Sequence, residues 1–221
     1  MGDLFDFWFE YTTVVPKGFV RLFGKLAEFT DRGIAVHLFR GNHDIWAFDY
    51  LRKEIGIQLH REHEIAEFWG KKFFLAHGDG YGPGDHGYKF IKKVFELPVN
   101  QWLFRWLHPD WGTKMALYWS RKSRIANMAK EGKIENGGEP TRERLFLFAK
   151  EYLEQHPDIS FFVMGHRHRP LDIPIQDQAR CIILGDWINL YTYAVFDGIT
   201  MELKSFPDQA KSSIKSASRA E

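Results

Sequence analysis

The chain has 221 residues, enough to bury a sizeable core as one domain or as one domain with an insertion. Its formal net charge of +1 gives no overall positive field, so composition does not favour nucleic acid as a partner. The single cysteine, Cys181, excludes a disulfide framework and a metal site built from several thiolates.

The N-terminal segment, "MGDLFDFWFEY", is acidic and aromatic. It lacks the basic stretch and the small-residue cleavage site of a signal peptide. Residues 18–33 then carry apolar side chains at helical spacing and end in glycine, which predicts a helix. No apolar run approaches the roughly 20 residues that span a bilayer, so we expect a soluble or peripheral protein.

One pattern then occurs four times along the chain: a short apolar run rich in β-forming residues, followed by a polar loop. The four runs are residues 33–39 before "RGNHD", 71–76 before "HGDGYGPGDHG", 159–164 before "GHRHRP" and 179–184 before "GDWIN". A helix is predicted over residues 139–157, and a hairpin turns at Asp197-Gly198. Alternating strands and helices predict an α/β fold whose ligands gather at the carboxyl ends of the strands.

Residues 83–139 interrupt this alternation, because three consecutive stretches read as helices. Aromatic side chains crowd the segment: Trp102, Phe104, Trp106, Trp111 and Trp119. We interpret the segment as a helical cap inserted into a core formed by residues 1–82 and 140–206. The polar tail, residues 207–221, is expected to be disordered. For each aromatic residue the alternative is that it only packs the cap on the sheet.

Polar residues that suit metal ions follow the predicted strands. Their donors are carboxylate, amide and imidazole groups, a mixture that suits Mn, Fe or Zn ions. His166 and His168 lie two residues apart, so one can face each of two ions, and Asp3 can bridge two ions about 3.5–4 Å apart. A single histidine after a strand is more often a structural hydrogen-bonder, so only the ordered set indicates a metal site. The set is Asp3, Asp6, Asn42, His43, His77, Asp79, His166 and His168.

The ordered motifs "GDLFD", "GNHD", "HGD" and "GHRH" resemble those of the calcineurin-like metallophosphoesterases. The resemblance implies a four-layer α/β fold, a β-sandwich flanked by helices, with two divalent metal ions, expected to be Mn²⁺, at the strand ends. The implied ligands are Asp3 as bridging carboxylate, Asn42, His77 and His166 for one ion, and His168 for the other. The resemblance also implies that His43 lies beside the scissile phosphate as acid or charge stabiliser. Asp6 would orient His43, because a carboxylate on the far ring nitrogen fixes the tautomer.

The chain departs from the family pattern at its start. The family's first motif, Asp-x-His after the first strand, is absent, and the sequence begins one residue before Gly2. We therefore expect one ion to lack an aspartate and a histidine, and the first strand of the sheet to be missing. A mis-called start or a fragment is the expected cause.

A closer resemblance covers nearly the whole chain. It is carried by "GDLFDFWFEY", "VVPKGFVR", "GNHDIW", "LAHGDG", "GHRHRP" and "LGDWINLYTYAVFDG". These stretches are similar to the family members of lipid A biosynthesis, Bacteroidota sequences above all, that hydrolyse the diphosphate of UDP-2,3-diacylglucosamine to lipid X and UMP. The resemblance implies a UDP-linked lipid substrate and a peripheral position on the cytoplasmic face of the inner membrane. The aromatic cap would offer the acyl chains an apolar slot, worth about 0.8 kcal/mol per buried methylene.

Two smaller patterns match the substrate contacts that the resemblance implies. Asp85 and Tyr88 stand at the spacing expected for contacts to the glucosamine. Ser123, Asn127 and Lys130 fall at i, i+4 and i+7 of a predicted cap helix, so they share one face that could meet the sugar and its phosphate. An exposed polar helix surface would look the same. The full predicted substrate-binding set is Asn42, His43, Asp85, Tyr88, Ser123, Asn127, Lys130 and His166.

Alternatives stay open at this point. An apolar stripe from Phe90 to Leu97, with three lysines beside it, is compatible with a helix lying on anionic lipid and equally with a solvated face. Another phosphodiesterase or nucleotide phosphatase of the same fold is a rival function. A non-catalytic scaffold is a second rival, favoured by the missing Asp-x-His motif. No nucleic-acid partner is expected, and the sequence predicts no oligomeric state.

Overall fold

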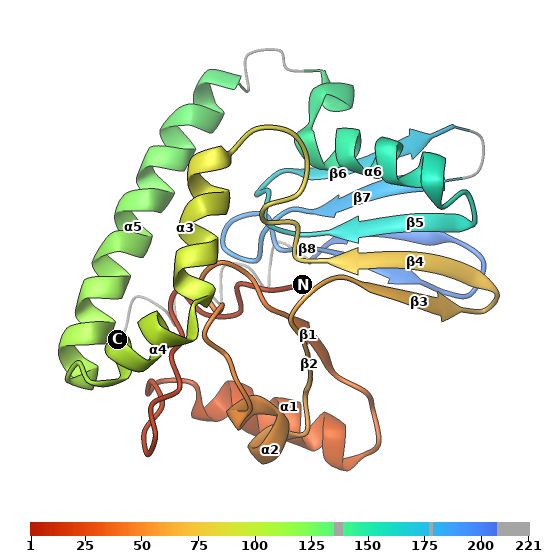
Figure 1. Ribbon diagram of the computed structural model, residues 1–221. Coiled ribbons are helices and arrows are strands. Elements are labelled where there is room, and N and C mark those ends of the chain that lie inside the picture. The colour runs from red at the N-terminus through yellow and green to blue at the C-terminus, as the bar shows by residue number, and fades with distance from the viewer. Residues whose placement is uncertain (135–138, 177–178, 207–221) are drawn as a thin grey trace.

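The computed structural model describes residues 1–134, 139–176 and 179–206, and for residues 124–134 the description is limited to the helix that they form (Figure 1). The predicted tail, residues 207–221, lies outside this range, as do residues 135–138 and 177–178.

The main sheet has five strands in the order β3-β4-β5-β7-β6. Strands β4, β5 and β7 run parallel, whereas β3 and β6 pair antiparallel at the two edges. The strands are β3 (Glu64–Phe68), β4 (Lys71–Ala76), β5 (Ile159–Met164), β6 (Pro170–Ile175) and β7 (Ala179–Leu184). The carboxyl ends of β4 and β5 therefore lie side by side, which is where parallel sheets place their ligands.

Both faces of this sheet are covered, because side chains alternate between faces along each strand. On β5, Phe162 and Met164 join the cluster under helix α6 (Arg144–Gln155). The alternate residues Phe161 and Val163 pack toward the hairpin of β8 (Thr192–Phe196) and β9 (Met201–Ser205). A strand buried on both faces explains why the β5 sequence is apolar at every position but Ser160.

A smaller unit holds the N-terminal third of the chain. It consists of α1 (Val20–Asp31), β1 (His37–Phe39), α2 (Tyr50–Ile55) and β2 (Gln58–His60). Strands β1 and β2 pair parallel, and the two helices pack with them around an apolar cluster that includes Phe5, Trp8 and Leu51.

Three helices stand together at the left of Figure 1, beside the sheet: α3 (His86–Glu96), α4 (Pro98–Arg105) and α5 (Pro109–Ile134). They are joined to the N-terminal loops by aromatic packing, since Phe104 lies against Phe9 and Trp46. The indole Nε1 of Trp46 also donates to the Phe95 carbonyl at 2.8 Å. A short 3₁₀ turn, η1 (Pro140–Arg142), leads into α6. The division into a core and an inserted cap remains our interpretation.

Most predicted elements are confirmed: the strands over residues 71–76, 159–164 and 179–184, the C-terminal hairpin, and the helices over residues 18–33 and 139–157. The predicted strand over residues 33–39 is shorter, beginning at His37. The sequence reading did not anticipate α2, β2, β3 or β6.

Candidate metal centre

Asp3 lies in the N-terminal loop, in a backbone conformation with φ of +52° that directly follows Gly2 at +87°. One carboxylate oxygen, Oδ1, accepts the backbone N–H of His43 at 2.9 Å. The other, Oδ2, is 3.3 Å from Nε2 of His77. The backbone of Gly41 approaches so closely that a Cβ there would clash with the Asp3 carboxylate. The motifs "GDLFD" and "GNHD" are thus interlocked around one carboxylate.

His77 follows β4 directly and is 4% exposed. Its Nδ1 donates to the carbonyl oxygen of Met1 at 2.7 Å, which fixes the ring. Burial opposes the charged form, but the negative charge of Asp3 prevails, so that the pKa of His77 is raised to about 9. Nε2 is buried and has no hydrogen-bond partner within the part of the chain that the structure describes.

His166 follows β5 and also has a positive φ, +62°. Its Nδ1 lies 3.1 Å from Oδ1 of Asn42. Because an amide oxygen only accepts, Nδ1 is the donor and Nε2 carries the lone pair. Burial and the positive charge of His77 lower the pKa of His166 to about 4, so the ring is neutral at pH 7.

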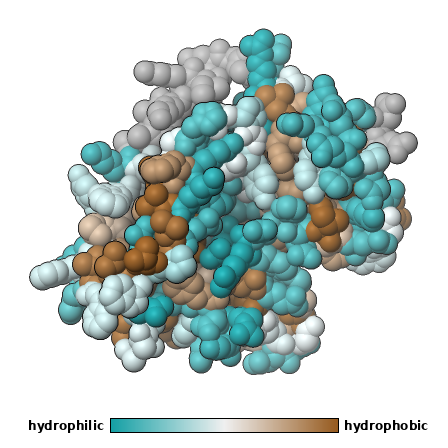
Figure 2. Space-filling view, in the orientation of Figure 1, coloured by the Kyte–Doolittle hydropathy of each residue, from teal (hydrophilic) through white to brown (hydrophobic). Residues whose placement is uncertain are grey.

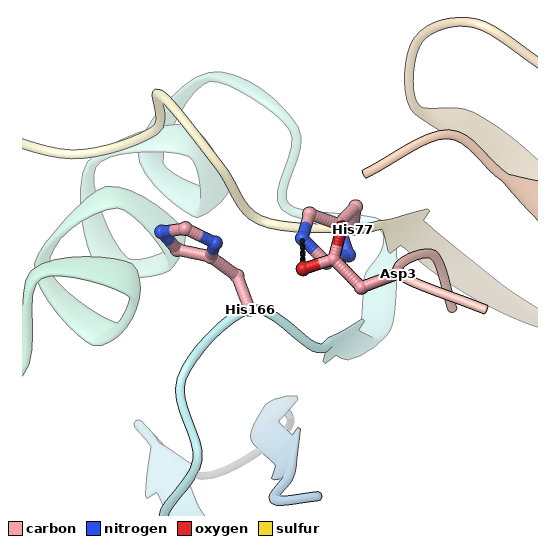
Figure 3. Close-up of side chains that lie close together, drawn as sticks. All are labelled: Asp3, His77 and His166. Atoms are coloured by element: carbon pink, nitrogen blue, oxygen red, sulfur yellow. Dashed lines mark ion pairs between the residues drawn. The ribbon is translucent and has the colours of Figure 1, made fainter. Parts of the chain in front are cut away.

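Asp3, His77 and His166 face one another in Figure 3. One donor atom from each lies within 4.8 Å of the other two. A carboxylate oxygen and two imidazole nitrogens form a donor set that suits borderline divalent ions. The buried Nε2 of His77, which has no hydrogen-bond partner among the described residues, fits the same interpretation. The residues present therefore fit a divalent metal ion, and the structure brings these three predicted residues together.

The His43 ring is held by two contacts. Its Nδ1 is 3.0 Å from the backbone carbonyl of Asp6 and 3.0 Å from Oγ of Ser120, on the cap helix α5. One contact that orients His43 thus comes from the Asp6 main chain, and the role proposed for the Asp6 carboxylate stays a prediction. Ser120 was missed, because a lone serine within a helix carries no signal in the sequence.

Two further buried acids support the loops: Asp44, to which the sequence analysis gave no role, and Asp79, which it counted among the metal-binding candidates. Asp44 is fully buried and accepts the backbone N–H groups of Gly41 and Leu4, so it ties the first two motifs together. Asp79, 4% exposed, accepts from the Tyr88 hydroxyl and pairs with Lys92 at 2.8 Å, which joins α3 to the end of β4. Helix α3 is therefore fixed to the candidate metal centre through Asp79.

The remaining predicted site residues lie elsewhere or have other partners. His168 is not one of the three clustered ligands, and its Nδ1 is 3.5 Å from Oδ2 of Asp186. Asp85 pairs with Arg144 at 3.3 Å, and Ser123 is exposed on α5. The Asn127 and Lys130 side chains lie outside the described part of the structure.

Residues 1–170 match the family model of the calcineurin-like phosphoesterases. The chain is 42% identical over 216 residues to a UDP-2,3-diacylglucosamine hydrolase of Porphyromonas gingivalis, an alignment that covers 94% of this chain and 82% of that protein. Proteins of the same name from Yersinia pestis and Yersinia pseudotuberculosis are 26% identical over 211 residues, covering 94% of this chain and 84% of theirs.

Proposed function

The chain belongs to the calcineurin-like phosphoesterase family, and on that basis we propose that it hydrolyses the diphosphate of UDP-2,3-diacylglucosamine in lipid A biosynthesis. Water attacks phosphorus, the P–O bond to the bridging oxygen breaks, and the products are UMP and lipid X. The observation that carries the proposal is the cluster of Asp3, His77 and His166, since these donors suit the ions that cleave phosphate esters.

In this proposal Asp3, His77 and His166 hold a divalent ion, with Asn42 beside them and His168 serving a second ion. We propose Mn²⁺ for both. Such ions supply a hydroxide at neutral pH and positive charge against the phosphoryl oxygens. The hydrogen bond between Nδ1 of His166 and Oδ1 of Asn42 supports this assignment, because it leaves the Nε2 lone pair of His166 for an ion.

His43 is the group that we assign to the leaving oxygen. With Nδ1 held by the carbonyl of Asp6 and the hydroxyl of Ser120, Nε2 is the ring nitrogen left to transfer a proton or place positive charge. The Ser120 contact comes from helix α5, so the position of this helix and the orientation of His43 are linked. Asp85, Tyr88, Ser123, Asn127 and Lys130 remain the proposed contacts to the sugar.

A peripheral position on the cytoplasmic face of the inner membrane is also part of the proposal. None of the described helices is long and apolar enough to cross a bilayer. Large apolar side chains nevertheless stand exposed on α3–α5, among them Phe90, Trp102 and Trp106, and Figure 2 shows an apolar patch over these helices at the lower left. An exposed patch of this kind marks an interaction surface.

The decisive experiment measures turnover of UDP-2,3-diacylglucosamine and of bis(p-nitrophenyl) phosphate with Mn²⁺ and with EDTA. We expect Mn²⁺-dependent formation of UMP and lipid X, one ¹⁸O atom from labelled water in a product, and a strong preference for the lipid. Preference for the soluble diester would favour a different phosphodiesterase. Binding of Mn²⁺ without turnover of either compound would favour a non-catalytic scaffold.

A further inference from the structure

A cavity of about 380 Å³ adjoins the candidate metal centre. Its walls come from the loops after β1 and β2, the end of β4, the glycine-rich loop and α3, and it shares His77 with the metal centre. In Figure 2 the middle of this face, over α3 and the loops beneath it, is strongly hydrophilic. The cavity is large enough for a small organic ligand, since such sites usually measure about 300–1,000 Å³.

The lining of this cavity is rich in cations: Arg40, Arg61, Lys89, Lys92 and Lys93. Three carboxylates oppose them, those of Glu62, Asp79 and Glu96, which leaves two positive charges in excess. Lys92 is neutralised by Asp79 at 2.8 Å. The excess positive charge therefore belongs to the arginines and the other two lysines, which favours an anionic ligand.

The two arginines are the strongest evidence that the cavity binds an anion. Nη1 of Arg40 donates to the Ile45 carbonyl at 2.8 Å, but its Nε is buried and has no hydrogen-bond partner among the residues described. Arg61 lines the same cavity, so two guanidinium groups face it. A phosphate there would accept the free N–H of Arg40, and arginine is suited to bind phosphate in a bidentate geometry.

We propose that this cavity binds the nucleoside monophosphate half of the substrate diphosphate. The inference rests on the proposed function, which requires both a polar and an apolar end of the substrate to extend from the metal centre. The exposed aromatic residues lie on α3–α5, whereas this cavity is polar and reaches His77. Its guanidinium and carboxylate groups also match the acceptors and the single N–H donor on the edge of a uracil ring.

The variants for the test are Arg61→Gln and Lys93→Gln, because neither residue belongs to the candidate metal centre. Arg105→Gln is the matched control, since Arg105 lines a different cavity, between residues 10–15 and α2. The first readout is UMP binding by calorimetry in the presence of Mn²⁺, with inorganic phosphate and uridine as comparison ligands. The second is kcat and KM for UDP-2,3-diacylglucosamine. Thermal melting confirms that each variant is folded.

We expect Arg61→Gln to weaken UMP binding about tenfold, as loss of a charge-assisted hydrogen bond would. KM should rise by a similar factor with kcat within about twofold, while Arg105→Gln leaves both constants unchanged. Equal losses for UMP and inorganic phosphate would overturn the assignment, because the site would then recognise phosphate alone. Unchanged UMP binding in both cavity variants would overturn it as well.

The two proposals can fail separately. If the wild-type protein does not hydrolyse the lipid, the proposed function fails, while the UMP titrations still decide whether the cavity takes a nucleotide. If the lipid is hydrolysed and UMP binding is insensitive to Arg61 and Lys93, the function stands and the cavity assignment is wrong.

Discussion

At the scale of single residues, the candidate metal centre depends on atoms brought together from three distant loops. The "GNHD" motif is the clearest case, because its four residues have four separate contacts. Gly41 makes room for the Asp3 carboxylate, Asn42 accepts from His166, His43 meets Ser120, and Asp44 binds two backbone N–H groups. Because each of the four residues makes a different contact, we expect substitutions within the motif to have different consequences.

Replacement of His43 by alanine should abolish turnover of the lipid and leave the metal content unchanged. The imidazole is proposed to act on the leaving oxygen, and it is not part of the three-residue ligand cluster. Metal content is measured by plasma emission spectroscopy beside the kinetics. Loss of bound metal in the variant would show that His43 is a ligand, contrary to the role assigned here.

Gly41→Ala should impair both metal binding and stability. A Cβ at Gly41 would clash with the Asp3 carboxylate, so we expect a loss of about 1–3 kcal/mol in urea unfolding, the range for overpacked sites, and weaker Mn²⁺ affinity. The control is Gly24→Ala in α1, where a Cβ meets nothing within 4 Å. That variant should gain about 0.5–1 kcal/mol, since alanine favours a helix more than glycine does. Similar effects of both changes would contradict this explanation.

The single thiol should be inert in the folded protein. Cys181 is fully buried in β7, and burial raises the pKa of its thiol to about 12. At pH 8 we expect no reaction with Ellman's reagent in the native state and release of one equivalent in guanidinium chloride, because only the thiolate reacts. Rapid native-state reaction would mean that β7 opens readily.

At the scale of elements, the contact between the cap helices and the N-terminal loops depends on few side chains. Phe104 packs against Phe9 and Trp46, whereas Trp106, two residues later, is 74% exposed. Phe104→Ala should therefore destabilise the protein by about 2–4 kcal/mol, and Trp106→Ala by less than about 0.5 kcal/mol, both measured by urea unfolding. Equal effects would show that Phe104 does not join the cap to the core.

The elements that could be predicted are those whose buried side chains form a simple pattern of apolar residues in the sequence. Strands β4, β5 and β7 lie inside the sheet and are largely apolar. The missed strands are edge strands or short pairs: β3 reads "EIAEF" with mostly exposed side chains, and β6 contains two prolines, which an edge tolerates. Helix α2 has only six residues, too few for helical periodicity to be seen.

The candidate site was predictable to a similar extent. His77 and His166 could be found because each is a metal-binding residue type next to a predicted strand, and Asp3 because it lies in the motif "GDLFD". Asp79 was a metal-binding candidate, but its pairing with Lys92 and the role of Asp44 could not be foreseen, since an aspartate that binds backbone N–H groups or a neighbouring lysine looks like an ordinary turn residue. Ser120 depends on how α5 packs against the GNHD loop, which no local pattern encodes.

At the scale of the whole molecule, the exposed aromatic residues of α3–α5 predict binding to lipid surfaces. The protein should float with vesicles that contain anionic lipid, and a double variant, Trp102→Ser with Trp106→Ser, should weaken this binding at unchanged thermal stability, because both side chains are exposed. The matched control is Trp69→Ser, a tryptophan that is 71% exposed on the sheet side. Retention of vesicle binding in the double variant would exclude this face.

The central strands β4 and β5 are direct neighbours in the sheet, yet α3, α4 and α5 all lie between them along the chain. The entropy of closing such a long connection grows only with the logarithm of its length, so a doubled connection would cost about 0.6 kcal/mol more. The length of the segment between His77 and His166 thus has little effect on the stability of the sheet that aligns them. Insertions between α3, α4 and α5 that keep Tyr88, Lys92 and Ser120 in place could alter the acyl chains accepted while the hydrolytic centre stays assembled, which makes these connections the natural place for specificity to diverge.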